Sequence, residues 1–144
     1  EPAVTSSNRP ASPDDEKRDE VASVDPAVLR DLRQLDETGE LLSTLITHFL
    51  DETPQQLGVM QAALRERQTA ILAETAHTLK GSSGNLGARQ MQQLCNELQT
   101  LGYANALVIA GKRLARIETE FILVRAALLQ EQDRLLSIRP SNPS

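Results

Sequence analysis

The chain has 144 residues, of which 40% are apolar and only 2% aromatic, and this is enough apolar material for one compact domain with a single core. A formal net charge of -5 provides no basic field for gathering nucleic acid or anionic lipid. One cysteine and two histidines exclude an intramolecular disulfide and leave a zinc site without enough ligands.

The chain has no apolar run near the roughly 18–20 residues that a membrane span needs. Residues 1–20 are acidic and contain prolines, unlike a signal peptide. We therefore expect a cytoplasmic domain, which could be the cytosolic C-terminal part of a membrane sensor kinase. Polar, proline-bearing sequence at both ends predicts a flexible linker over residues 1–24, a fold over 25–138 and a disordered tail over 139–144.

Five helices are predicted in chain order. Asp25 and Pro26 suit the N-cap and first position of a short helix to about residue 35, which we expect to cover one end of the fold. Longer helices follow over about 40–64, 69–83 and 88–101, and a long last helix carries apolar positions from Ala110 to Leu128; in all four these positions recur every three and four residues. Pro54 either kinks the second helix or begins a new one that Thr53 caps. Short connections favour an all-α, up-down-up-down antiparallel four-helix bundle with an extra N-terminal helix.

The informative stretch lies in the third predicted helix, around His77. A stripe of buried residues is predicted at Leu72, Ala76, Leu79 and Ser83, and His77 then points about 140° away from its centre, into solvent. A neutral imidazole keeps one nitrogen lone pair free near neutral pH, so an exposed histidine can accept a phosphoryl group.

Few side chains are expected to surround this histidine. We assign Ala73, Gly81 and Gly84 as small residues that leave space beside the imidazole, and glycine in an exposed helix costs about 1 kcal/mol relative to alanine. Lys80, one turn further on, can place an ammonium beside an anion formed on the ring. The hydroxyls of Ser82 and Ser83 are candidate hydrogen-bond donors to that anion.

The segment His77-Thr-Leu-Lys-Gly-Ser-Ser83, followed by Leu86-Gly87, resembles the signature of histidine-containing phosphotransfer (HPt) domains of multistep two-component phosphorelays. The resemblance covers roughly residues 37–130. It implies a four-helix bundle whose exposed histidine exchanges phosphate with receiver-domain aspartates, with Mg²⁺ held by the receiver and no cofactor or metal bound by this domain. It also implies that His77 is the phosphoacceptor, Lys80 its charge partner and Gly81 the residue that keeps space, and that Gln99 orients the imidazole. Gln92 is a competitor for that last role.

This interpretation makes the domain a phosphoryl carrier without an ATP site of its own, acting as a monomer between receivers of a sensor kinase and of a response regulator. Two alternatives remain: a structural helical interaction module, and a domain phosphorylated directly by an ATP-binding kinase domain. We interpret His48 as an ordinary surface histidine and Cys95 as a small core residue.

Overall fold

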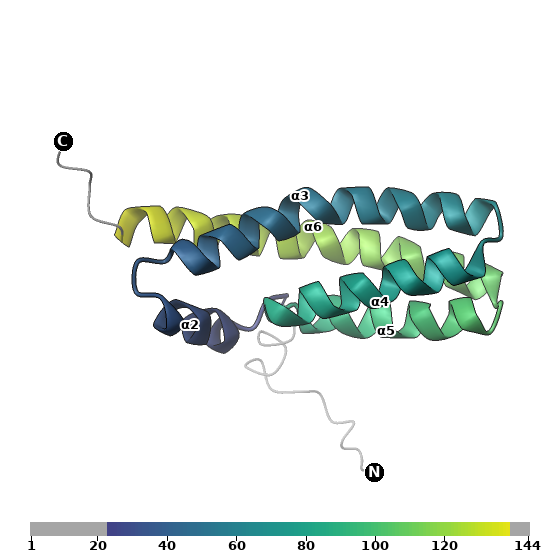
Figure 1. Cartoon of the computed structure of the whole chain (residues 1–144), viewed down its shortest axis with the longest axis horizontal. Helices are drawn as coiled ribbons and strands as arrows, with labels where there is room; N and C mark the ends of the chain where they lie inside the picture. Colours follow the sequence, from purple (N-terminus) through teal and green to yellow (C-terminus); the bar gives the residue numbers. More distant parts are fainter. Residues whose placement is uncertain (1–22, 139–144) are drawn as a thin grey trace, which may run out of the picture.

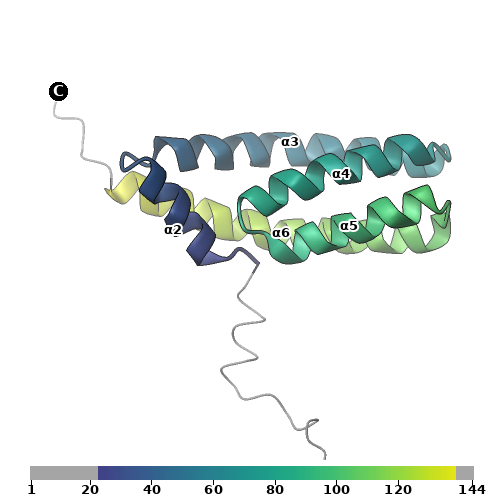
Figure 2. The same cartoon turned by 60° about the horizontal axis from the view of Figure 1, so that its bottom comes forward.

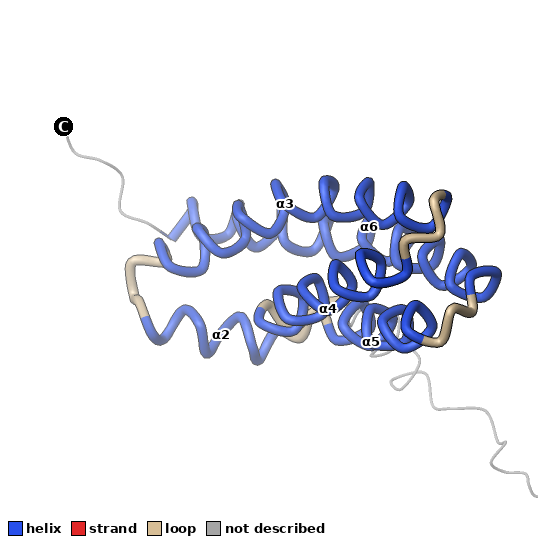
Figure 3. The backbone as a smooth tube through the Cα atoms, turned by 45° about the vertical axis from the view of Figure 1, so that its right-hand side comes forward, coloured by secondary structure: helices blue, strands red, loops and turns tan. Residues whose placement is uncertain are grey.

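The computed structural model describes residues 23–138, and every regular element in that range is a helix (Figures 1 and 3). The helices are α2 (Pro26–Leu35), α3 (Glu40–Arg65), α4 (Thr69–Asn85), α5 (Arg89–Tyr103) and α6 (Leu107–Ile138). The sequence-based expectations for residues 1–22 and 139–144 lie outside the described range. The predicted all-α class is confirmed.

Helices α3 to α6 form an antiparallel bundle in which consecutive helices are neighbours and α6 returns to pack on α3 (Figures 1 and 3). Each of the three bundle connections contains a residue with left-handed backbone, at Arg67 (φ 58°), Gly87 (φ 80°) and Asn105 (φ 58°). Such residues end helices because they turn the chain while the last carbonyls keep hydrogen-bond partners. Helix α4 packs on α3 and α5, and α6 packs on the same two helices, so α4 and α6 occupy opposite corners.

The apolar stripes predicted from the sequence form one continuous core along the bundle. On α6 the buried positions are Ala110, Leu114, Ile117, Phe121, Val124, Leu128, Glu131 and Leu135. The only two phenylalanines meet across α3 and α6, where the rings of Phe49 and Phe121 pack edge to face with centroids 6.0 Å apart. Spacings of three and four residues therefore bury one side of each helix and leave the opposite side in solvent.

Helix α3 runs without interruption from residue 40 to 65 through Pro54. Of the two predicted arrangements, a restart capped by Thr53 is therefore wrong. Thr53 and Leu57 are both buried, whereas Pro54 is exposed. Packing on both sides of the proline keeps the helix continuous, since tertiary contacts outweigh the lost backbone hydrogen bond.

Helix α2 covers the end of α3 and α6 that extends beyond α4 and α5 (Figure 2). Asp25 caps it by accepting a hydrogen bond of 2.9 Å from the Ala27 amide, and the Asp25 carboxylate also pairs with Arg89 at 3.0 Å. The Asp25 amide donates to the Gly87 carbonyl at 2.8 Å. Val24 is buried in the core, so the fold begins before residue 25 and the predicted linker boundary at 24 is wrong.

Candidate functional site

Helix α4 presents His77 to solvent. Its buried residues are Leu72, Ala73, Ala76, Leu79 and Ser83, which together form the side that faces the bundle. His77 is exposed, as the helical periodicity predicts. Within residues 23–138 its imidazole makes no hydrogen bond or ion pair, so both ring nitrogens are available to a partner.

The space one turn after His77 is empty. A Cβ atom added at Gly81 would meet nothing within 4 Å, and Gly81 itself is exposed. No packing inside the domain therefore requires a glycine at this position, although glycine weakens a helix. The open space lies on the same side of α4 as His77, because residues four apart are neighbours on a helix surface.

Lys80 lies on the side of α4 that borders α5. Its ammonium donates a hydrogen bond of 3.3 Å to the amide oxygen of Asn96. This contact links the lysine next to His77 to the neighbouring helix and restricts its flexible side chain. Asn96 carries no signal in the sequence by itself, because it is found only by pairing residues of the two helices.

The register of α4 against α5 follows from three contacts. Lys80 of α4 donates a hydrogen bond to Asn96 of α5. Ala73 of α4 lies opposite Gly102 of α5, where an added Cβ would be 3.3 Å from the Ala73 Cβ. Gly84 of α4 lies opposite Gln92 of α5, whose side-chain amide a Cβ at residue 84 would overlap. In each pair the two residue numbers add up to 175 or 176. Two antiparallel helices keep this sum constant along their contact.

This register places residue 99 of α5 at the level of His77. Gln99 is half-buried and shares one stripe of α5 with Gln92 and Asn96, at spacings of four and three residues. No hydrogen bond joins Gln99 to the imidazole in this structure, so its orienting role stays a prediction. Gln92 is at the level of Gly84, two turns away from His77, and the alternative assignment of Gln92 to the imidazole is wrong.

Two of the small residues assigned to the space around His77 serve another purpose. Ala73 is fully buried, and it is the residue that Gly102 of α5 approaches most closely. Gly84 makes room for the Gln92 side chain, whose amide nitrogen lies only 2.3 Å from where a Cβ would stand. Both predictions are therefore wrong, because α5 covers these positions and they allow close packing of the two helices. Gly81 alone opens space to solvent.

The serines also differ from expectation. Ser83 is buried, and its hydroxyl donates to the Leu79 carbonyl at 2.8 Å, so it cannot serve an anion on His77. The Ser82 hydroxyl donates to the same carbonyl at 3.2 Å. Ser82 is also about 140° around the helix from His77. Neither hydroxyl is directed at the imidazole, and the prediction that they stabilise an anion there is not supported by their geometry.

A large exposed side chain near the site was not anticipated. Tyr103 is 65% exposed and lies one turn beyond Gln99 on the same stripe of α5. By the register it stands at the level of Ala73, one turn from His77. The spacing 92, 96, 99, 103 in the sequence was the signal that could have identified it.

The other reactive side chains lack such surroundings. His48 is an exposed residue of α3 with its ring 4.0 Å from the Glu52 carboxylate, an ordinary surface pair. Cys95 is buried among the core residues of α5, and burial raises the pKa of its thiol to about 12. A thiol in that state is poorly nucleophilic.

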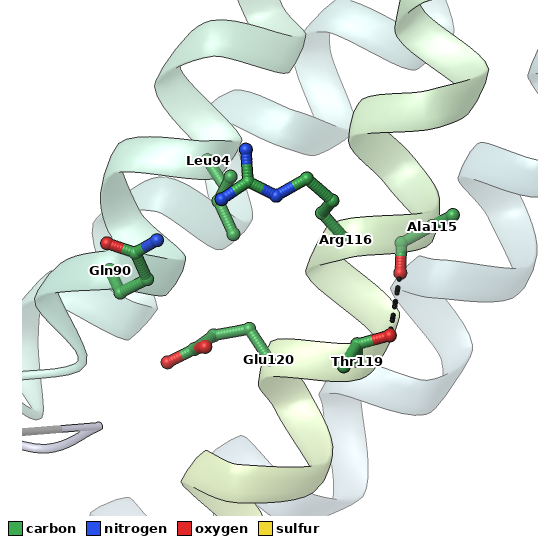
Figure 4. Close-up of a pocket in the computed structure, with 6 residues that line it drawn as sticks. All are labelled: Gln90, Leu94, Ala115, Arg116, Thr119 and Glu120. Carbon is green, nitrogen blue, oxygen red and sulfur yellow. Dashed lines mark hydrogen bonds between the residues drawn. The ribbon is translucent and has the colours of Figure 1, made fainter. Parts of the chain in front are cut away.

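A shallow hollow lies between α5 and α6 on the bundle surface (Figure 4). It is lined by Gln90, Leu94, Ala115, Arg116, Thr119 and Glu120. Desolvation raises the pKa of the Glu120 carboxyl, and the nearby Arg116 opposes this shift. The hollow is lined by no histidine or cysteine, and it lies on α5 and α6, whereas His77 is on α4.

Residues 23–138 contain no group of three or more histidine, cysteine or acidic side chains arranged to hold a metal ion. Over the same range no helix combines the length and the apolarity required to cross a bilayer.

Comparison with known proteins identifies the family. The family model described as "Hpt domain" matches residues 44–132, well over half of the chain. The chain belongs to the Hpt domain family. Histidine-containing phosphotransfer protein B from Pseudomonas aeruginosa PAO1 is 30% identical in sequence, with a TM-score of 0.73 over 78% of this chain and 96% of that one.

Two further relatives agree with this assignment. A protein from rice described as a histidine-containing phosphotransfer protein has a TM-score of 0.71 over 84% of this chain and 89% of that one. At 20% identity it shows a shared fold. Multistep phosphorelay regulator 1 of Schizosaccharomyces pombe is 26% identical over 81 residues, which are 55% of this chain and 28% of that protein. The chain thus spans less than a third of this curated relative.

The family assignment confirms the predicted bundle and the predicted role as a phosphorelay intermediate. Hpt domains are phosphoryl carriers, not enzymes with an ATP site of their own, and they interact with receiver domains.

Proposed function

We propose that His77 accepts a phosphoryl group from the aspartate of one receiver domain and passes it to the aspartate of another. The observation that carries this proposal is the exposed imidazole beside the empty space at Gly81. A receiver must bring its phosphoaspartate to bonding distance in line with a ring nitrogen. A side chain at position 81 would stand in the path of that approach.

The transfer exchanges one bond for another. A lone pair on an imidazole nitrogen attacks phosphorus, the N–P bond forms, and the P–O bond to the donor aspartate breaks and returns that aspartate to a free carboxylate. The second transfer reverses these changes with the acceptor aspartate as nucleophile. The carrier supplies mainly the nucleophile and local positive charge, because phosphoryl transfer depends on positioning and charge neutralisation.

Lys80 supplies this charge in our proposal. Residues three apart share a helix surface, so the ammonium can reach a phosphoryl group on His77. Its hydrogen bond to Asn96 keeps it on the α5 side of the imidazole, away from the open side at Gly81. We propose that Gln99, at the same level on α5, hydrogen-bonds the ring nitrogen that does not carry phosphate.

The partner surface extends over α4 and α5 in this proposal. Tyr103 offers an exposed aromatic side chain next to the site, and aromatic residues contribute strongly to protein interfaces. We assign the partners as receiver domains of a sensor kinase and of a response regulator, in the cytoplasm. The Mg²⁺ ion that the transfer requires is assigned to the receiver.

The test mixes the whole chain with a phosphorylated receiver and Mg²⁺ and maps the acid-labile phosphate. We expect label on His77, full loss of label in His77→Gln, and unchanged labelling in the matched variant His48→Gln. Label on another residue would refute the assignment. A parallel reaction uses ATP and a kinase domain without any receiver domain. Labelling of His77 in that reaction would indicate direct phosphorylation, because the relay requires a receiver.

A further inference from the structure

Helix α6 has a second regular face whose side chains are exposed in the described chain. Its large apolar members are 77% exposed at Val108, 67% at Ile122, 39% at Leu129 and 63% at Leu136. We call this face the outer ridge of α6. It consists of Val108, Ala115, Ile122, Leu129 and Leu136, with Lys112, Thr119, Ala126 and Asp133 between them.

The outer ridge has the spacing of a helix–helix seam. The series Val108, Ala115, Ile122, Leu129 and Leu136 recurs every seven residues. Each of the other four members lies four residues after a member of that series. This alternation of four and three is the pattern by which one helix packs along another. The outer ridge lies about 150° around α6 from the buried stripe that contains Ile117 and Val124. One side of α6 therefore serves the bundle, and the other has the form of an interface without a partner.

We propose that a second copy of this chain packs antiparallel on the outer ridge, with Ile122 at the twofold axis. Ile122 is the middle member of the seven-residue series, so an antiparallel copy places Ala115 opposite Leu129 and Val108 opposite Leu136. The seven-residue series is therefore self-complementary when a second copy runs in the opposite direction, because apolar residues lie at equal distances on both sides of Ile122. A symmetric dimer needs such a self-complementary surface.

Charged residues in the outer ridge and beside it also match in the same register. Lys112 of one copy lies near Asp133 of the other, and Glu118 lies near Arg125. Within the described residues Lys112, Arg125 and Asp133 form no ion pair, and Glu118 accepts only a hydrogen bond from Gln61. Each intermolecular pair occurs twice by symmetry. A parallel dimer in register would instead set Lys112 beside Lys112 and Asp133 beside Asp133, which repel.

The size of the outer ridge suits a weak dimer. From residue 108 to 136 it is about 42 Å long at 1.5 Å per residue, and a helix is roughly 10 Å wide. Two such strips cover about 800 Å², close to the roughly 1,000 Å² at which specific interfaces begin. We therefore expect a dissociation constant on the order of micromolar or weaker.

The dimer leaves the phosphotransfer site free. The outer ridge belongs to α6, at the corner of the bundle opposite α4 and His77. In Figure 4, Arg116 and Glu120 extend from α6 toward α5, whereas Ala115 points away from α5. The two His77 sites of a dimer would accordingly face away from the twofold axis.

Sedimentation of the full chain from low micromolar to millimolar concentration provides the first test. We expect a monomer–dimer equilibrium whose dissociation constant rises about tenfold or more in Ile122→Asp. The matched control is Val59→Asp, which places the same charge at a 46% exposed apolar residue of α3 and should leave dimerisation unchanged. Circular dichroism shows whether each variant folds. A monomer throughout, or a dimer that Ile122→Asp does not weaken, overturns the proposal.

Disulfide crosslinking tests the orientation in a Cys95→Ala background. Ile122→Cys should crosslink to its own copy, and Ala115→Cys should crosslink only when mixed with Leu129→Cys. Crosslinking of Ala115→Cys to itself would show a parallel pair and overturn the proposed arrangement. Asp133→Lys should weaken the dimer, and adding Lys112→Asp should restore it. Phosphate acceptance by Ile122→Asp should equal that of the wild type. The dimer proposal can therefore be refuted without affecting the proposed phosphotransfer function, and the reverse also holds.

Discussion

The ammonium of Lys80 on α4 donates a hydrogen bond of 3.3 Å to the amide oxygen of Asn96 on α5. The lysine one turn from His77 is thereby held by a second helix. Because a lysine side chain is flexible, this contact determines where its charge stands when a partner approaches.

Changes at these two residues should slow phosphotransfer to different extents. Lys80→Ala should lower the transfer rate roughly tenfold, since it removes a charge-assisted hydrogen bond to the phosphoryl group. Asn96→Ala should lower it only about twofold to threefold, because the charge remains and only its position is lost. Rapid-quench measurement of the transfer rate checks both, with Lys80→Arg and Gln93→Ala as controls. An unchanged rate in Lys80→Ala would contradict the assigned role.

Two glycines should respond to alanine in opposite ways. Gly81→Ala should raise the free energy of unfolding by up to about 1 kcal/mol, because the new Cβ meets nothing and alanine favours the helix. Gly102→Ala should lower it by about 1 to 2 kcal/mol, because its Cβ would lie 3.4 Å from the backbone nitrogen of Ala73. Urea unfolding measures both values.

The phosphotransfer rates of the same two variants should show the opposite order, because the variant with the more stable fold should transfer phosphate more slowly. Gly81→Ala, and more strongly Gly81→Leu, should slow the transfer from a receiver although the fold is stable. Gly102→Ala should transfer at the wild-type rate under conditions where it remains folded. Rapid transfer to Gly81→Leu would show that the space beside His77 is not needed.

Acid should loosen helix α2 before the bundle. The pKa of Asp25 is lowered by its hydrogen bonds from the Ala27 amide and Arg89, and that of Asp36 by its bonds from Thr38 and Leu41. Because both pKa values are lower in the folded state, the stabilisation is present above the unfolded values, near 4, and is lost as the pH falls through the lowered ones.

Hydrogen exchange of the α2 amides, followed below pH 4, tests this expectation. Protection in α2 should fall while protection in the centre of α4 persists. Asp25→Asn and Asp36→Asn should lower the protection of α2 already at neutral pH. Asp31→Asn is the control, since its carboxylate makes no hydrogen bond within the described residues. Equal loss in α2 and α4 would mean that the helices unfold as one unit.

Cys95 should be inert in the folded domain. Burial raises the pKa of its thiol to about 12, so the reactive thiolate is scarce at pH 8 and the sulfur is covered by the core. We expect a colorimetric thiol reagent to modify it only after denaturant is added. Rapid modification of the native chain would show that α5 opens locally.

Local periodicity was sufficient to identify the helices and the exposure of His77. The buried stripe Leu72, Ala76, Leu79 and Ser83 follows from 3.6 residues per turn. Because this stripe faces the core, His77 is exposed whatever the arrangement of the other helices. The role of Gly81 could be predicted in the same way, because no other helix approaches the space beside it.

The residues that needed a second helix could not be placed from one sequence. Ala73 and Gly84 are neighbours of His77 on α4, but α5 covers them, and Asn96 meets Lys80 only through the register of the two helices. That register depends on how side chains of both helices interlock, which one helix's spacing does not specify. The sequence by itself therefore determined which nucleophile faces solvent, and only the tertiary structure decided which side chains surround it.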